Sequence, residues 1–146
     1  MRKLALGLLV CWAATQVYAG EWLTDVPKAM AKAKAEKKRV LLDFTGSDWC
    51  PPCKALHATV YTSKEFADYA DKNLVLVEID FPRTKQLPEA LKKANDALAK
   101  KYAIKGYPTT IVLDADGKEL VNIVGYSRET PSEFIAKLEK SAAKAK

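Results

Sequence analysis

Along residues 20–146, segments with apolar residues at every third or fourth position alternate with short continuous apolar runs. The continuous runs at residues 39–45, 74–80 and 109–113 predict buried strands, and residues 119–124 predict a strand that pairs back after a turn at Asp114 to Gly117. Segments with apolar residues every three or four positions predict helices, and several of them begin with a capping residue. The first helix is expected from Asp25 to about Lys38, with Trp22 sharing its apolar spacing. Further helices are expected from Pro51 through Val60, from a cap at Thr62 or Ser63 through Ala70, from Pro88 to Tyr102, and after Thr130.

The predicted order is helix, strand, two helices, strand, helix, two strands and a final helix. Strands that alternate with helices and end in a hairpin predict an α/β fold, with a central mixed sheet and helices on both faces. No repeat, low-complexity tract or Gly/Ser linker interrupts residues 20–146. We therefore expect this part of the chain to form a single domain.

The first nineteen residues have a different pattern from the rest of the chain. Arg2-Lys3 is followed by an apolar run from Leu4 to Ala14 and then by Val17-Tyr18-Ala19, with small residues where a signal peptidase cleaves. The run is too short to span a hydrocarbon core, which needs about twenty apolar residues. Lipidation at Cys11 is an alternative, disfavoured because Val10 precedes it. Residues 1–19 therefore predict a signal peptide, and export to the periplasm or the extracellular space.

Composition narrows the classes of function. The chain of 146 residues is 49% hydrophobic and 29% charged, which excludes a disordered tail, and three cysteines are too few for a disulfide-stapled miniature protein. Removal of residues 1–19 would lower the formal charge from +6 to +4 and leave two cysteines. Most lysines are interleaved with Ala and Glu, as on a solvated helix face, so we expect no nucleic-acid partner.

The two remaining cysteines, Cys50 and Cys53, are three residues apart at the start of a predicted helix. This spacing puts their Cβ atoms about 5–6 Å apart, close enough for a disulfide. At the helix cap, the Cys50 sulfur would face unpaired N–H groups that stabilise a thiolate, while Cys53 would act as the resolving thiol. A purely structural disulfide is disfavoured because so short a loop gains little entropy. Half of a zinc site is disfavoured because only His57 could serve as a further nitrogen or sulfur ligand.

The chain resembles the thioredoxin superfamily over about residues 25–143, in three runs: Leu42-Asp43-Phe44, Trp49-Cys50-Pro51-Pro52-Cys53-Lys54 and Gly106-Tyr107-Pro108-Thr109. The resemblance implies a thioredoxin-like fold in which Pro108 is cis and lies against the cysteine pair. It also implies that the backbone of Tyr107 pairs with a substrate chain and that Trp49 both contacts substrate and shields Cys50. An ordinary trans turn for Pro108 and a core-only role for Trp49 are the alternatives.

The resemblance assigns two further residues. Asp43 is similar to the buried acid that accepts the proton of the resolving thiol, and burial in an apolar strand would raise its pKa; the alternative is a strand-edge charge. Gly125 is similar to the glycine that keeps the substrate groove open. Asp43 precedes Cys50 by seven residues, one more than usual, and Leu76 stands where thioredoxins often carry a lysine near the acid. These departures indicate a secreted thioredoxin-like branch rather than thioredoxin itself.

The expected function is that of a thiol–disulfide oxidoreductase acting on protein disulfides through Cys50 and Cys53. We expect no cofactor, no metal and no membrane span, a monomer, substrate proteins with disulfides or thiols, and a redox partner that recycles the pair. The direction of electron flow is open. Reductase or isomerase work is favoured because Pro51-Pro52 lacks the histidine of strongly oxidising relatives. The alternative is a non-catalytic binding module or copper-handling protein using Cys50, Cys53 and His57.

Overall fold

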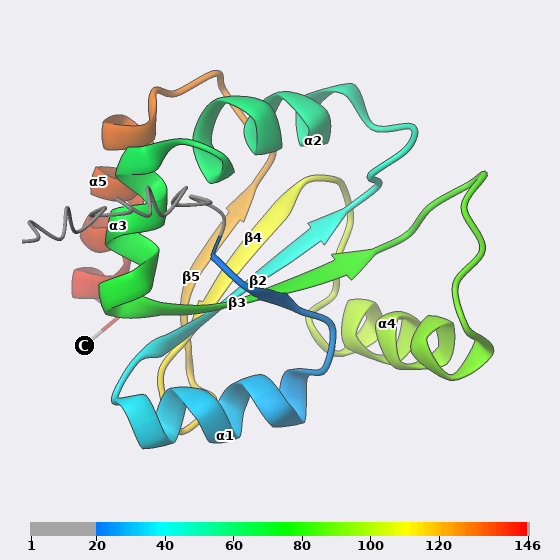
Figure 1. The fold of residues 1–146 in the computed structure, drawn as a ribbon, viewed down its shortest axis with the longest axis horizontal. Helices are drawn as coiled ribbons and strands as arrows, with labels where there is room; N and C mark the ends of the chain where they lie inside the picture. The colour runs from blue at the N-terminus through cyan, green and yellow to red at the C-terminus, as the bar shows by residue number, and fades with distance from the viewer. Residues whose placement is uncertain (1–19, 146) are drawn as a thin grey trace, which may run out of the picture.

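The computed structural model describes residues 20–145, which form one five-stranded sheet covered by helices on both faces (Figure 1). The strand order is β1-β3-β2-β4-β5; β1, β3 and β2 are parallel, and β4 and β5 are antiparallel to their neighbours. The sheet is therefore mixed, as the sequence predicts. In chain order the elements are β1 (Trp22–Leu23), α1 (Val26–Glu36), β2 (Arg39–Thr45), α2 (Pro51–Leu56), the π-helix η1 (His57–Tyr61), α3 (Lys64–Asn73), β3 (Leu74–Asp80), α4 (Glu89–Lys101), β4 (Thr109–Leu113), β5 (Glu119–Val124) and α5 (Pro131–Lys144).

Two apolar clusters fill the space on either side of the sheet. On one face, α2, η1, α3 and α5 pack around a cluster that includes Leu56, Phe66 and Phe134. On the other face, α1 and α4 lie below the sheet in Figure 1, over a cluster that includes Ala29 and Phe44. Successive residues of a strand point to opposite faces, so β2 and β3 supply both clusters and are buried along almost their whole length.

The predicted capping residues start the helices. The carboxylate of Asp25 accepts a hydrogen bond from the backbone N–H of Lys28 at 2.9 Å, and Ser63 accepts one from Phe66 at 3.1 Å. Thr130 and Glu133 form a reciprocal capping box at the start of α5. These bonds satisfy backbone donors that the first turn of a helix otherwise leaves free.

The structure differs from the sequence prediction at two elements. Trp22 lies in β1 and pairs with Leu76 of β3, instead of extending the apolar spacing of α1. The helix after Cys53 changes at His57 from an α-helix to the π-helix η1. The signal peptide predicted at residues 1–19, including Cys11, lies outside the described residues. Within residues 20–145, no helix combines the length and hydropathy needed to cross a membrane.

Candidate active site

Cys50 and Cys53 lie just beyond the carboxyl end of the central strand β2, at the start of α2. They form a disulfide with an S–S distance of 2.03 Å and a Cα–Cα distance of 5.3 Å. Cys50 is the N-cap residue, and its sulfur accepts a hydrogen bond from the backbone N–H of Cys53 at 3.3 Å. Pro51 and Pro52 begin the helix without donors, so this N–H is the first helical donor available to the sulfur. Both cysteines are buried, with exposed fractions of 2% for Cys50 and 4% for Cys53. Their different roles therefore follow from their positions in the helix and not from a difference in exposure.

Trp49 is fixed beside the cysteine pair by contacts with two distant segments. Its indole Nε1 donates to the backbone oxygen of Phe81 at 2.8 Å, and the guanidinium of Arg83 stacks 3.9 Å from its ring centroid. The ring of Tyr107 meets it edge-on, with centroids 5.8 Å apart. A Cβ atom on Gly46 would stand 2.4 Å from the indole, so glycine is required there. Trp49 and Tyr107, both predicted site residues, are thus in contact.

Asp48, in the longer turn before Trp49, holds the loop between β3 and α4. Its carboxylate accepts backbone hydrogen bonds from Arg83 at 2.9 and 3.1 Å, Thr84 at 2.7 Å and Lys85 at 3.1 Å, and one from the Thr84 hydroxyl at 2.6 Å. These donors hold the pKa of Asp48 well below its ordinary value. The sequence analysis missed this role, although an acid directly before Trp49 was visible.

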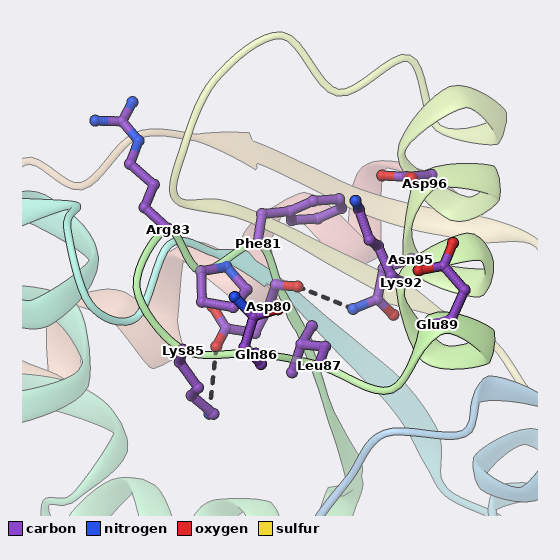
Figure 2. Close-up of a pocket in the computed structure, with 11 residues that line it drawn as sticks. Asp80, Phe81, Arg83, Lys85, Gln86, Leu87, Glu89, Lys92, Asn95 and Asp96 are labelled. Atoms are coloured by element: carbon purple, nitrogen blue, oxygen red, sulfur yellow. Dashed lines mark hydrogen bonds and ion pairs between the residues drawn. The ribbon is translucent and has the colours of Figure 1, made fainter.

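The same loop is fixed at its base by Asp80 and from the side of α4. The Asp80 carboxylate accepts from the Ser47 amide at 2.9 Å and from its hydroxyl at 2.5 Å, and forms an ion pair with Lys85 at 3.5 Å. The buried Asn95 of α4 donates its Nδ2 to the Asp80 carbonyl at 2.9 Å, as the dashed line in Figure 2 marks. A polar pocket of about 290 Å³ lies between loop and helix, beside these bonds. Ser47 and Asp48, both in the turn before the cysteines, therefore position this loop next to Trp49.

Pro108 directly precedes β4, and the peptide bond between Tyr107 and Pro108 is cis, as the resemblance implies. Gly125, at the end of β5, donates its N–H to the Pro108 carbonyl at 2.7 Å. It has a φ of +83°, which favours glycine, and no atom lies within 4 Å of a Cβ placed there. The neighbouring Val124 is 65% exposed. Tyr107, Pro108 and Gly125 thus lie together where β4 begins and β5 ends, next to the carboxyl end of β2.

Asp43 is buried in β2 with 5% exposure, and its Oδ1 atom has no hydrogen-bond partner. Burial is the main cause that raises its pKa to about 8, and the carboxyls of Glu78 and Asp80 raise it further. Asp43 and Cys53 line the same cavity of about 240 Å³. The strand residue paired with Asp43 is Glu78, whereas Leu76, which the sequence comparison placed near the acid, pairs with Leu41. Glu78 is a site residue that the sequence analysis missed, because only the register reveals it.

His57, the candidate metal ligand of the alternative interpretation, is exposed and also lines this cavity. The sulfurs of Cys50 and Cys53 are bonded to each other here, so the oxidised form offers neither as a thiolate ligand. Among the described residues, no group of three or more His, Cys, Asp or Glu side chains is placed to hold a metal ion.

Comparisons with known proteins agree with this geometry. The thioredoxin-like domain family matches residues 26–142. The chain is 34% identical over 117 residues to "Disulfide bond reductase DsbH" of Chlamydia pneumoniae, which covers 80% of this chain and 69% of the relative. It is 32% identical over 111 residues to "Thiol:disulfide interchange protein DsbD" of Vibrio cholerae, covering 75% of this chain but only 17% of that longer protein.

Solved structures give the same result. The structure "DsbH Oxidoreductase" superimposes with a TM-score of 0.79 at 26% identity, covering 98% of this chain and 94% of the other. The reduced C-terminal domain of DsbD from Neisseria meningitidis gives a TM-score of 0.61 at 28% identity, covering 80% and 93%. With its cysteine pair at the start of a helix, the chain belongs to the thioredoxin-like domain family and is a thiol–disulfide oxidoreductase.

Proposed function

We propose that this oxidoreductase works as a reductase of protein disulfides. The observation that carries the proposal is the helix start Cys50-Pro51-Pro52-Cys53, in which two prolines leave the Cys53 N–H as the donor to the Cys50 sulfur. Strongly oxidising members of the superfamily owe their potential to a stabilised thiolate in the reduced form. Fewer donors stabilise the Cys50 thiolate less, which favours the disulfide and hence electron donation to substrates. One relative carries the name disulfide bond reductase.

In the proposed reaction, the Cys50 thiolate attacks a substrate disulfide and one substrate sulfur leaves as a thiolate. Cys53 then attacks the Cys50 sulfur of the mixed disulfide, and the second substrate sulfur leaves. Two electrons pass to the substrate, and the protein is left with the Cys50–Cys53 disulfide. Asp43 takes the proton of Cys53 during resolution, because the two residues line the same cavity and Oδ1 of the buried Asp43 has no hydrogen-bond partner.

Substrate docking is assigned to the end of the sheet where β4 begins and β5 ends. The backbone at Tyr107 and Pro108 pairs with an extended substrate segment, Trp49 supplies an aromatic wall, and Gly125 leaves room for the substrate chain. The exposed Val124 gives this end of the sheet an apolar contact.

The test is reduction of insulin disulfides with dithiothreitol by the mature protein, beside Cys50→Ser and Cys53→Ser variants. We expect acceleration by the wild type, none by Cys50→Ser, and a trapped mixed disulfide with Cys53→Ser. Equal rates for wild type and Cys50→Ser would refute the proposal. Titration against glutathione then fixes direction: a potential near that of thioredoxin, about −270 mV, supports a reductase, and one near about −120 mV contradicts it.

We also propose that the chain is exported after cleavage behind Ala19 and acts as a single-domain monomer that a separate redox partner recycles. The basic start and apolar run of residues 1–19 support export. N-terminal sequencing of protein from the periplasmic fraction should begin at Gly20, and size-exclusion chromatography should give the mass of one mature chain. An uncleaved N-terminus in the cytoplasmic fraction would contradict export.

A further inference from the structure

The cavity behind the cysteine pair contains more ionisable groups than the proposed reaction uses. It has a volume of about 240 Å³ and is bounded by α2, the start of η1 and the ends of β2 and β3. Cys53 and the unpartnered carboxyl of Asp43 border it, and the exposed side chains Lys54 and His57 lie at its rim. Its lining residues are Asp43, Thr45, Ser47, Cys53, Lys54, His57 and Glu78.

Among the residues that line this cavity, Glu78 is the one that lies opposite Asp43 on the neighbouring strand. The two are register partners in the parallel pair β2–β3, so their side chains leave the sheet on the same face, beneath α2. Asp43 is buried and Glu78 is half-buried, and both line this cavity. Burial and the nearby carboxyl of Asp80 also raise the pKa of Glu78, while Lys85 and His57 lower it.

The charges around Asp43 are predominantly acidic. Glu78 and Asp80 of β3 both raise the pKa of Asp43. Lys85 pairs with Asp80, and within the described residues no ion pair involves Asp43 or Glu78. The titratable and charged groups that face Asp43 or the cavity are Cys53 and Lys54 of α2, His57 and Tyr61 of η1, Glu78 and Asp80 of β3, and Lys85 of the following loop.

We propose that Glu78 is a positioning residue that acts through Asp43. The negative carboxylate of Glu78 adds to the effect of burial and favours the protonated form of Asp43 in the oxidised protein. The cavity connects Asp43 to water at the rim formed by Lys54 and His57. This inference rests on the proposed proton-transfer role of Asp43. It adds that the charge of Glu78 sets the fraction of Asp43 that is protonated when the Cys50–Cys53 disulfide is reduced.

A thiolate of the reducing partner attacks the Cys50 sulfur, a mixed disulfide forms, and the Cys50–Cys53 bond breaks with its electron pair on the Cys53 sulfur. Asp43 gives its proton to that sulfur and becomes the carboxylate that accepts the Cys53 proton in the next round. A second thiol of the partner then loses its proton to water and attacks the partner sulfur of the mixed disulfide. Cys50 leaves as a thiolate, so two electrons have entered the pair and the partner holds the disulfide.

The experiment measures the rate at which dithiothreitol reduces the oxidised mature protein, followed by tryptophan fluorescence from about pH 5 to pH 9. Dividing the rate of the variant by that of the wild type at each pH cancels the effect of dithiothreitol ionisation, which is the same for both proteins. For Glu78→Gln we expect a ratio near one at low pH, where Asp43 is protonated in both proteins. Loss of a charge on a neighbouring residue should lower the pKa of Asp43, about 8 in the wild type, by about one unit, so at pH 8 the variant should be about fivefold slower.

Glu78→Asp keeps the charge and should restore the wild-type profile. Glu65→Gln, an exposed acid of α3, is the matched control and should follow the wild type throughout. A carbon-detected NMR titration of the Asp43 carboxyl should show a lower midpoint in Glu78→Gln. This measurement does not depend on the rate.

Two results would overturn the inference, and they are distinguishable. If Asp43→Asn is slow at every pH but Glu78→Gln follows the wild type, Asp43 transfers the proton and Glu78 does not act on it. If Asp43→Asn itself follows the wild type, the proposed role of Asp43 fails, and that of Glu78 fails with it.

Discussion

Replacement of Asp43 by Asn should stabilise the fold while slowing the reaction. Asp43 has an ordinary pKa of 3.8, and burial raises it to about 8 in the folded protein. Near neutral pH the unfolded chain carries an ionised Asp43 and the folded protein a neutral one, so the acid favours unfolding. At about 1.4 kcal/mol per pKa unit, roughly three units between the ordinary pKa and pH 7 amount to about 4 kcal/mol.

The Asn variant keeps the size of the side chain but cannot ionise in either state. Allowing for residual structure in the denatured chain, its free energy of unfolding near pH 7 should exceed the wild-type value by about 2–4 kcal/mol. The sign follows from a raised folded-state pKa: wild-type stability is fully present below about pH 4 and is lost as the pH rises toward 8. The gain of the variant should therefore vanish below about pH 4.

Urea denaturation of both proteins, with the disulfide intact, at several values between about pH 3.5 and pH 8 measures this difference. Asp71→Asn, at an exposed position of α3, is the matched control and should show no such pH-dependent gain. A gain of equal size at every pH, or none near neutrality, would refute the account of Asp43 as a neutral buried acid.

Three further changes probe the surroundings of the site. Asp48→Ala removes the acceptor of the Arg83, Thr84 and Lys85 amides, so hydrogen exchange should accelerate at these amides and KM should rise more than kcat falls; unchanged exchange would contradict the role of Asp48. Tyr61→Phe removes a 3.1 Å hydrogen bond to Thr110 in the core, and thermal unfolding should show a loss of about 1 kcal/mol. Gly125→Ala forces a side chain into a φ of +83° without a clash, so calorimetry should show a loss of about 1–2 kcal/mol, and an unaltered Tm would count against the conformational requirement.

Most of the fold could be predicted from the sequence because local and tertiary preferences agree. β2 and β3 are continuous apolar runs because both of their faces are buried, and Ser63 and Thr130 cap helices through bonds to residues three positions away. β1 was missed because two residues are too short to show a period, and its strand state depends on pairing with β3. The π-helix was missed because its cause is backbone hydrogen bonding after His57 and not a residue pattern.

Some residues of the site could also be predicted from the sequence, and others could not. Cys50, Cys53 and Pro108 belong to short motifs, so the sequence was sufficient to find them. Glu78 and Asp48 act across 35 or more residues, through strand register in one case and loop amides in the other. Such contacts are set by the tertiary structure, so the position of Asp48 before Trp49 was visible in the sequence but its partners were not.

The two apolar clusters support different parts of the site. Leu56 and Tyr61, which follow the cysteine pair, pack in the cluster beneath α3 and α5, on the same face as Asp43. Tyr107 and Phe81, on the docking side, pack against the cluster beneath α1 and α4. Substitutions that tune reactivity and substitutions that tune partner choice therefore fall in separate layers. Their energetic effects should be nearly additive except at Trp49, which contacts Tyr107 and directly precedes Cys50. Proteins with this fold can therefore change their substrate proteins during evolution without a change in the reactivity of the cysteine pair.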